Sequence, residues 1–151
     1  MANIFDSECD AIVNTINCVG VMGGGLAKQF RSKYPDMNAA YQAACARGQV
    51  EIGRMWSWYD DASGRWIINF PTKDDWRDPS CTRYVIEGMA DLVDVITDLG
   101  LRSIAIPPLG CGLGGLKWDE VEPLILVALD HVKGVQVNIY EPDGGLYTIQ
   151  T

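Results

Sequence analysis

A short apolar run leads into a glycine-rich loop in the stretch Ala11-Ile-Val-Asn-Thr-Ile-Asn-Cys-Val-Gly-Val-Met-Gly-Gly-Gly-Leu-Ala27. A second run and loop follow the same plan in Ile104-Ala-Ile-Pro-Pro-Leu-Gly-Cys-Gly-Leu-Gly-Gly-Leu116. Glycine lets backbone N–H groups approach a ligand closely and adopts positive φ angles without strain. A strand, a glycine loop and a helix N-terminus together form an anion site, most often for phosphate. Two such loops in one small chain predict a cleft that holds a diphosphate from two sides.

The rest of the chain alternates strand-like and helix-like segments, which predicts one α/β domain over residues 1–151. Strands are expected over Ala11–Asn14, Arg54–Tyr59, Arg65–Phe70, Arg102–Ile106 and Val135–Tyr140. Helices are expected over Leu26–Lys33, Met37–Ala46, Cys81–Leu99 and Asp119–Val132. The alternation predicts a largely parallel or mixed sheet, in which ligands bind beyond the carboxyl ends of the strands. Both glycine loops begin at such ends, so we expect them to line one cleft.

The charge of the chain limits which partners it can bind. Its 12 basic and 20 acidic side chains give a net charge of −8, which argues against an extended nucleic-acid surface. An acidic protein can still act on one modified nucleotide or on a chain end. No stretch approaches the roughly 18 apolar residues of a membrane span, and Met1–Asp6 lacks the basic start of a signal peptide. These features favour a cytoplasmic location.

The five cysteines do not form a metal or disulfide pattern. Their number is odd, no CxxC occurs, and His131 is the single histidine. We therefore expect no metal ion and no other cofactor. Cys18 and Cys111 lie inside the glycine loops, but His131 falls late in a predicted helix and gives neither thiol a partner base. Most of the cysteines are therefore expected to be small buried hydrophobic residues.

A third stretch, Ile67-Ile-Asn-Phe-Pro-Thr-Lys-Asp-Asp-Trp-Arg77, carries a lysine after an apolar strand that Pro71 is expected to end. A lysine in this position is either a surface charge or a cleft residue, and it becomes a nucleophile where its ammonium is desolvated. The two aspartates that follow Lys73 favour its charged form, so the residues alone favour the surface charge by a small margin. Trp76 covers a ligand or packs on the core, and the core position is favoured.

Neither glycine loop carries the P-loop or the dinucleotide fingerprint. The chain instead resembles the macrodomain family through four segments in order: Asp10-Ala-Ile-Val-Asn14 with Asn17, Val21-Met-Gly-Gly-Gly-Leu-Ala27, Asn69-Phe-Pro-Thr-Lys73 and Ile106-Pro-Pro-Leu-Gly-Cys-Gly112. The resemblance covers Asn3 to Pro142 and is strongest to the branch of DarG-like DNA ADP-ribosyl glycohydrolases and terminal ADP-ribose protein glycohydrolases. It implies a three-layer α/β/α sandwich with a mixed, mostly parallel sheet and a cleft for ADP-ribose.

The resemblance also assigns roles to individual residues. It implies that Lys73 is the catalytic residue, with Thr72 beside it in the ligand site. The positions matched to the adenine are Asn3, Ile4, Tyr140, Glu141 and Pro142, and those near the distal ribose are Asn14 and Asn17. The positions matched to the diphosphate and distal ribose are Gly20, Val21, Met22, Gly23, Gly24, Gly25 and Leu26 in the first loop, and Leu109, Gly110, Cys111, Gly112, Leu113 and Gly114 in the second.

The reaction that the resemblance implies is cleavage at the anomeric carbon of the distal ribose. It releases ADP-ribose from an acidic side chain of a protein or from thymidine in DNA. The lysine either attacks this carbon, so that a carbonyl-type intermediate is hydrolysed, or stabilises developing charge. The alternative function is a reader module that binds ADP-ribose without turnover. The implied partners are ADP-ribose and ADP-ribosylated protein or DNA, with no membrane, and the protein is expected to be a monomer.

The sequence departs from the family pattern in three places. Gly114 stands where the protein-deglycosylating relatives carry an aspartate, so a lysine–aspartate pair is not available. Asp74 and Asp75 stand where the branch often has basic or histidine residues. The chain begins where the first strand of the family usually ends. No partner-binding extension is evident, and we expect a stand-alone hydrolase rather than a toxin-neutralising protein.

Overall fold

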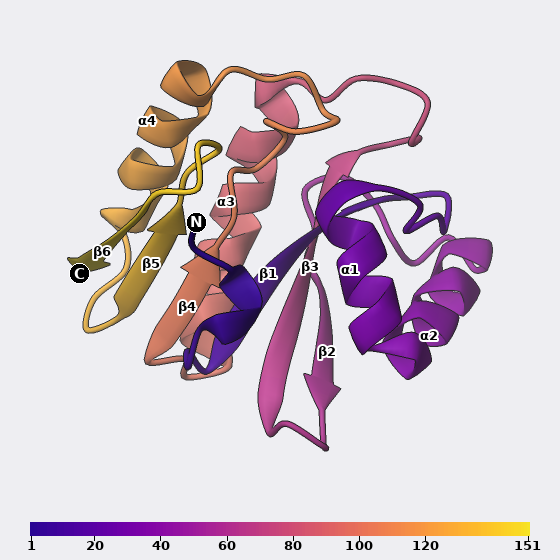
Figure 1. The fold of residues 1–151 in the computed structure, drawn as a ribbon, viewed down its shortest axis with the longest axis horizontal. Helices are drawn as coiled ribbons and strands as arrows, with labels where there is room; N and C mark the ends of the chain where they lie inside the picture. The colour runs from indigo at the N-terminus through magenta and orange to yellow at the C-terminus, as the bar shows by residue number, and fades with distance from the viewer.

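One six-stranded sheet, ordered β2-β3-β1-β4-β5-β6, runs through the computed structural model, which describes residues 1–151 (Figure 1). The strands are β1 (Ala11–Asn17), β2 (Trp56–Asp60), β3 (Arg65–Lys73), β4 (Ser103–Ile106), β5 (Gln136–Tyr140) and β6 (Leu146–Gln150). The four central strands are parallel, and the edge strands β2 and β6 are antiparallel to their neighbours. The expected mixed, mostly parallel sheet is therefore confirmed.

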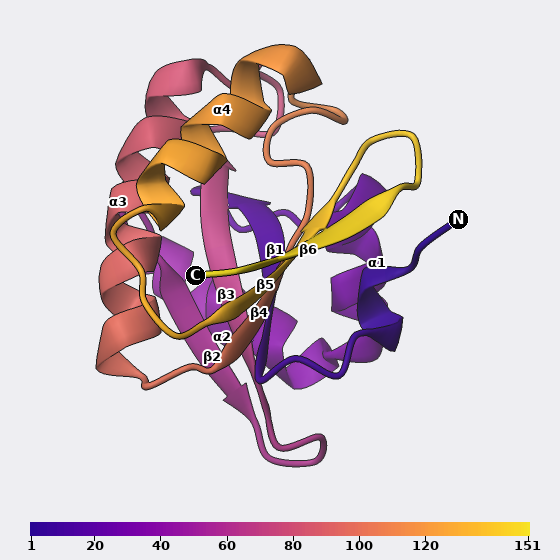
Figure 2. The same cartoon turned by 90° about the vertical axis from the view of Figure 1, so that its left-hand side faces the viewer.

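Helices cover both faces of this sheet, as the edge-on view in Figure 2 shows. The helices are α1 (Gly25–Lys33), α2 (Pro35–Ala46), α3 (Thr82–Asp98) and α4 (Trp118–Leu129), with a short 3₁₀ turn over Ile4–Asp6. Because side chains alternate along a strand, Ala11 and Val13 of β1 join the core with α3 and α4, whereas Ile12 and Ile16 join the core with α1 and α2. The three-layer α/β/α sandwich is confirmed.

Close packing of α3 fixes the strand that carries Lys73. The buried face of α3 includes Val85, Met89 and Leu92. Gly88 lies on the same face, and a Cβ atom there would come within 2.3 Å of the Phe70 ring. The helix backbone therefore rests directly on β3, three residues before Lys73.

Strands β1 and β3 run further than the sequence predicts. Pro71 does not end β3, which continues to Lys73, and β1 extends to Asn17. Since β2 pairs with β3 only as far as Asn69, Pro71 lies beyond the edge strand, where its missing N–H leaves no partner unpaired on that side. The extension aligns Lys73 with Asn17 in neighbouring strands.

The sheet also contains a strand that the sequence analysis missed. Pro142 lies in a hairpin turn after β5, and β6 then pairs with β5. The turn depends on Gly144, whose φ of +91° suits glycine. Strand β6 also contacts α4, where the Tyr147 hydroxyl donates a hydrogen bond of 2.8 Å to the Glu122 carboxylate.

Two helix boundaries differ from those expected by more than one residue. Helix α2 begins at Pro35 rather than Met37, and a proline is tolerated at this first position because its missing N–H has no intrahelical partner. At the other end of the chain, α4 stops at Leu129 rather than Val132, and Pro123 lies inside it. None of the helices is both long and apolar enough to cross a membrane.

Candidate functional site

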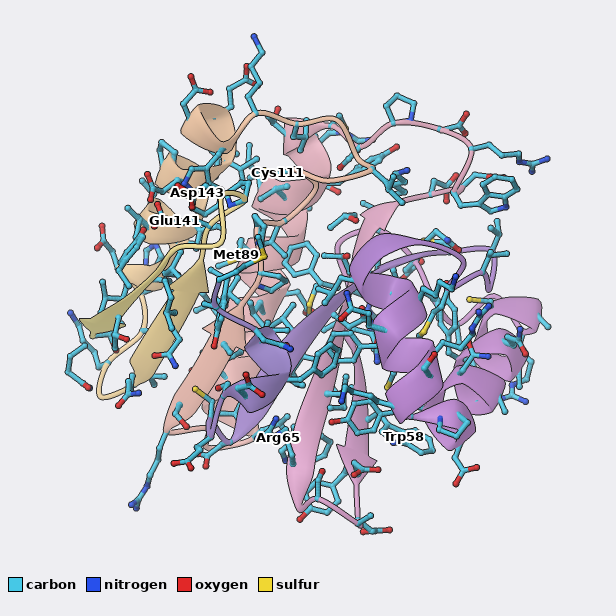
Figure 3. The ribbon with its side chains drawn as sticks, in the orientation of Figure 1. Trp58, Arg65, Met89, Cys111, Glu141 and Asp143 are labelled. Carbon is cyan, nitrogen blue, oxygen red and sulfur yellow. The ribbon has the colours of Figure 1, made fainter.

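A cleft of about 700 Å³ lies beyond the carboxyl ends of the central strands, between the two glycine loops. The residues that line it are Thr15, Ile16, Asn17, Val21, Gly23, Gly24, Gly25, Leu26, Ala27, Thr72, Lys73, Trp76, Pro107, Pro108, Gly110, Gly112, Leu113 and Gly114. Both loops contribute, as their positions at strand ends predict. Figure 3 shows Cys111 in the second loop above the sheet, whereas Trp58 and Arg65 lie at the opposite end of the strands.

Asn17 holds the first loop in shape. Its side-chain oxygen accepts hydrogen bonds from the backbone N–H groups of Val19 (3.1 Å) and Val21 (3.3 Å), and its amide group donates to the Val21 carbonyl (2.7 Å). The buried Tyr41 hydroxyl lies 2.6 Å from the Asn17 carbonyl and 2.9 Å from its side-chain oxygen. Because the side chain of Asn17 is hydrogen-bonded to the first loop, Asn17 positions the backbone of that loop at the cleft.

The N-terminus of α1 opens into the cleft without a side-chain cap. Its first N–H groups have no intrahelical partners, and they carry the positive end of the helix dipole. Gly24 precedes the helix, and a Cβ atom on it would lie 2.9 Å from a methyl group of Leu113 in the second loop. Leu113 is 73% exposed, so it bridges the two loops across the cleft rather than filling the core.

The second loop is closed by its own backbone. Gly110 has a φ of +71°, and its carbonyl accepts a hydrogen bond from the Leu116 N–H at 2.9 Å. The Gly114 carbonyl accepts from the Ser80 N–H at 3.0 Å. A Cβ atom at Gly114 would lie only 2.5 Å from the Gly110 carbonyl oxygen. This loop conformation therefore has no room for a side chain, such as aspartate, at position 114.

Lys73 ends β3 inside the cleft and is half-buried. Its Nζ donates a hydrogen bond of 3.3 Å to the Trp76 carbonyl. Lys73 forms no ion pair, because Asp75 instead binds the Arg77 guanidinium through two hydrogen bonds of 2.9 and 2.6 Å. The guanidinium also lowers the pKa of the Asp75 carboxyl to about 2. The amine thus faces the cleft without a carboxylate bound to it.

Trp76 is not part of the core, and the prediction that it packs there is wrong. Its side chain is 52% exposed and lines the cleft, of which it is the single aromatic residue. Strand β3 continues past Pro71 to Lys73, and Trp76 lies in the turn that follows the strand. The Arg77 guanidinium lies 5.7 Å from the centre of its ring.

The thiols of the glycine loops are poor nucleophiles. Burial and the neighbouring Asp74 raise the pKa of Cys18 to about 12, and burial raises the pKa of Cys111 to about 11. Cys9 is buried, whereas the other four cysteines are half-buried, so the expectation that most of the cysteines are buried is wrong. No three His, Cys, Asp or Glu side chains are grouped so as to hold a metal ion.

Ten residues assigned to the site by resemblance do not line this cleft. They are Asn3, Ile4, Asn14, Gly20, Met22, Leu109, Cys111, Tyr140, Glu141 and Pro142. Asn3 and Tyr140 line a second pocket of about 630 Å³. Glu141 and Pro142 belong to the β5–β6 turn, and Figure 3 labels Glu141 there. Asn14 is fully buried, and its amide group donates a hydrogen bond of 3.0 Å to the Asn69 side chain.

The structure adds residues to the cleft that the sequence analysis did not assign to it. They are Thr15, Ile16, Ala27, Trp76, Pro107 and Pro108. Most of them flank predicted residues, so a wider window around each loop would have included them. Tyr41 supports the cleft from α2, and no sequence signal links it to Asn17.

Comparisons with known proteins agree with this architecture. A model of the Macro domain family matches residues 13–125. A DNA ADP-ribosyl glycohydrolase of Thermus aquaticus is 52% identical over 143 residues, which cover 93% of this chain and 39% of that protein. The macrodomain of Mycobacterium tuberculosis DarG superposes with a TM-score of 0.90 at 44% identity, covering 94% of this chain and 95% of that one.

A third relative was solved with a ligand. Thermosipho africanus DarTG, in complex with ADP-ribose, superposes with a TM-score of 0.86 at 33% identity, covering 93% of this chain and 40% of that one. The chain spans about two-fifths of the length of two curated DNA ADP-ribosyl glycohydrolases that it matches. The family model, the sheet order and the two glycine loops together show that this chain belongs to the macrodomain family.

Proposed function

We propose that this macrodomain hydrolyses the bond between ADP-ribose and a base of DNA, with Lys73 as the catalytic residue. The position of Lys73 carries the proposal, since it ends β3 inside a cleft formed by two glycine loops. The names of the relatives support DNA as the substrate, and the Thermosipho africanus protein was solved with ADP-ribose. The free N–H groups of α1 and the second loop would hold the diphosphate, so that the distal ribose reaches Lys73.

Lys73 has two ways to act on this substrate. As a neutral amine, Nζ forms a bond to the anomeric carbon while the bond from this carbon to the base nitrogen breaks and the base leaves with a proton. Water then hydrolyses the covalent intermediate and returns free lysine and ADP-ribose. As an ammonium, Lys73 instead stabilises the charge that develops on the leaving base while water attacks the carbon.

In either pathway Lys73 works without a carboxylate from the second loop. The clash at Gly114 excludes the aspartate that the protein-deglycosylating relatives carry at that position. Because the protein-deglycosylating relatives carry this aspartate, the lack of room for it at Gly114 supports a DNA-linked rather than a protein-linked substrate.

The test is release of ADP-ribose from two substrates, thymidine-linked ADP-ribosyl DNA and glutamate-linked ADP-ribosyl protein. We expect release from the DNA by the unmodified protein and by Lys133→Ala, a control at an exposed lysine outside the cleft. Lys73→Ala is expected to release none. Lys73→Arg separates the two pathways, because arginine keeps the charge but is not a nucleophile. Binding of ADP-ribose without release from either substrate would identify the chain as a reader module instead.

A further inference from the structure

Trp76 is an exposed indole at the mouth of the cleft, beside the residue proposed to act on the substrate. A large aromatic side chain that is 52% exposed leaves apolar area for a ligand to cover. The remaining lining residues offer aliphatic, hydroxyl, amide and backbone groups, with no second aromatic ring. The cleft therefore contains one place at which a flat ring can stack.

The backbone of Trp76 lies next to the lysine amine. Its carbonyl accepts the hydrogen bond from Lys73 Nζ at 3.3 Å. A group bonded to the carbon on which Lys73 acts must lie near the same amine. For a DNA substrate this group is the base itself, whereas for a protein substrate it is a small ester.

The indole is held in place from its own turn. Asp75 binds the Arg77 guanidinium through both carboxylate oxygens, and it also accepts a hydrogen bond of 2.9 Å from the Arg77 backbone N–H. The guanidinium then lies 5.7 Å from the centre of the Trp76 ring. A ring fixed in this way loses little conformational freedom when a ligand stacks on it.

Charge favours the face of a base over the phosphate backbone as the recognised group. The turn carries Asp74, Asp75 and Asp78, and the chain as a whole has a net charge of −8. Arg77 is already bound to Asp75. Phosphate contacts need free cations, whereas stacking of a base on an aromatic ring does not.

We propose that Trp76 is the stacking platform for the nucleobase that carries the ADP-ribose, and that it determines the preference for a DNA-linked substrate. The inference rests on the proposed function and deepens it. Asp75 and Arg77 act through Trp76 as positioning residues. Removal of the indole should therefore affect the DNA substrate and leave free ADP-ribose unaffected.

The experiment compares Trp76→Ala, Trp76→Phe and Ile86→Ala, the last being a control at an exposed position of α3 outside the cleft. For each protein, affinity is measured by calorimetry for free ADP-ribose and for an ADP-ribosyl-thymidine oligonucleotide, the latter in the Lys73→Ala background so that the substrate stays intact. KM and kcat are then measured with the oligonucleotide, and both the calorimetry and the kinetics are carried out at 50 and 200 mM salt.

We expect Trp76→Ala to weaken oligonucleotide binding and raise KM by about tenfold to a hundredfold, the range for loss of one stacked base. Trp76→Phe should recover most of this loss, and the affinity for free ADP-ribose should stay within twofold. Equal loss for the oligonucleotide and for free ADP-ribose would overturn the proposal, as would unchanged oligonucleotide affinity in Trp76→Ala. The proposal would also be overturned if the protein bound the oligonucleotide more tightly than free ADP-ribose at 50 mM salt but not at 200 mM salt, because this salt dependence would indicate phosphate contacts.

The affinity measurements test the stacking platform separately from the proposed hydrolysis. If the unmodified protein releases no ADP-ribose but Trp76→Ala still weakens oligonucleotide binding selectively, hydrolysis is refuted and the stacking platform is supported. If release occurs and Trp76→Ala leaves KM unchanged, hydrolysis stands and the platform is refuted.

Discussion

Gly112 offers the most direct way to test the cleft between the two loops. It lines the cleft, its φ is not positive, and a Cβ atom built on it meets no atom within 4 Å. A glutamate at this position should therefore leave the loop unstrained and place a carboxylate where we propose that the diphosphate binds. We expect Gly112→Glu to abolish most ADP-ribose binding without loss of fold.

The expected magnitude follows from Coulomb's law. Two like charges about 6 Å apart repel by roughly 3 kcal/mol at the effective dielectric constant of about 20 found near protein surfaces. One such repulsion weakens binding by about a hundredfold, and the second phosphate adds to it. Gly112→Gln has nearly the same shape without the charge, so we expect it to lose much less affinity.

The assay is calorimetric titration with ADP-ribose, with thermal unfolding as the check on folding. Gln150→Glu is the matched control, since it adds the same charge in β6 at the opposite end of the sheet from the cleft. A Gly112→Glu protein that binds ADP-ribose within threefold of the unmodified protein would refute the two-loop cleft. Equal losses in Gly112→Glu and Gly112→Gln would refute the electrostatic reasoning.

Three further predictions concern the scaffold of the site. Gly88→Ala should lower the free energy of unfolding in urea by about 1–3 kcal/mol, because the new methyl group overpacks against Phe70. Helix propensity alone predicts that alanine stabilises the helix, so a stabilised variant would contradict the close contact between Gly88 and Phe70. Tyr41→Phe should cost about 1–2 kcal/mol of stability and weaken ADP-ribose binding, because Asn17 loses the hydrogen bond that the hydroxyl donates to its two oxygens. Calorimetry and denaturation that match the unmodified protein would rule out this role. At pH 8 a thiol with a pKa of about 11 is about one part in a thousand ionised. Cys111 should thus react slowly with a thiol reagent, the rate rising with pH, and Cys111→Ala should keep full hydrolysis, whereas fast labelling at pH 8 would show an activated thiolate.

The sequence predicts the part of the site that local patterns encode. Glycines after apolar runs mark the two loops, and the alternation of elements places both loops at strand ends, which is enough to predict one shared cleft. These local patterns do not predict which side chains face the cleft. Trp76 is a large apolar residue, and its exposure depends on the turn that Asp75 and Arg77 close after the strand ends.

Other features depend on contacts between distant segments. The conformation that excludes a side chain at Gly114 needs the Ser80 N–H from the segment before α3. The Asn17 loop needs Tyr41 from α2. Strand β6 is short and mostly exposed, so its own sequence carries little signal until β5 provides a partner.

We propose that Lys73 cleaves ADP-ribose from DNA inside the two-loop cleft. The most direct measurement is the single-turnover rate of ADP-ribose release from thymidine-linked ADP-ribosyl DNA, for the unmodified protein and for Lys73→Met, with ADP-ribose affinity measured on the same samples. We predict a drop in rate of at least a hundredfold in Lys73→Met, with the affinity for ADP-ribose kept within about threefold. Equal rates in the two proteins would contradict the account.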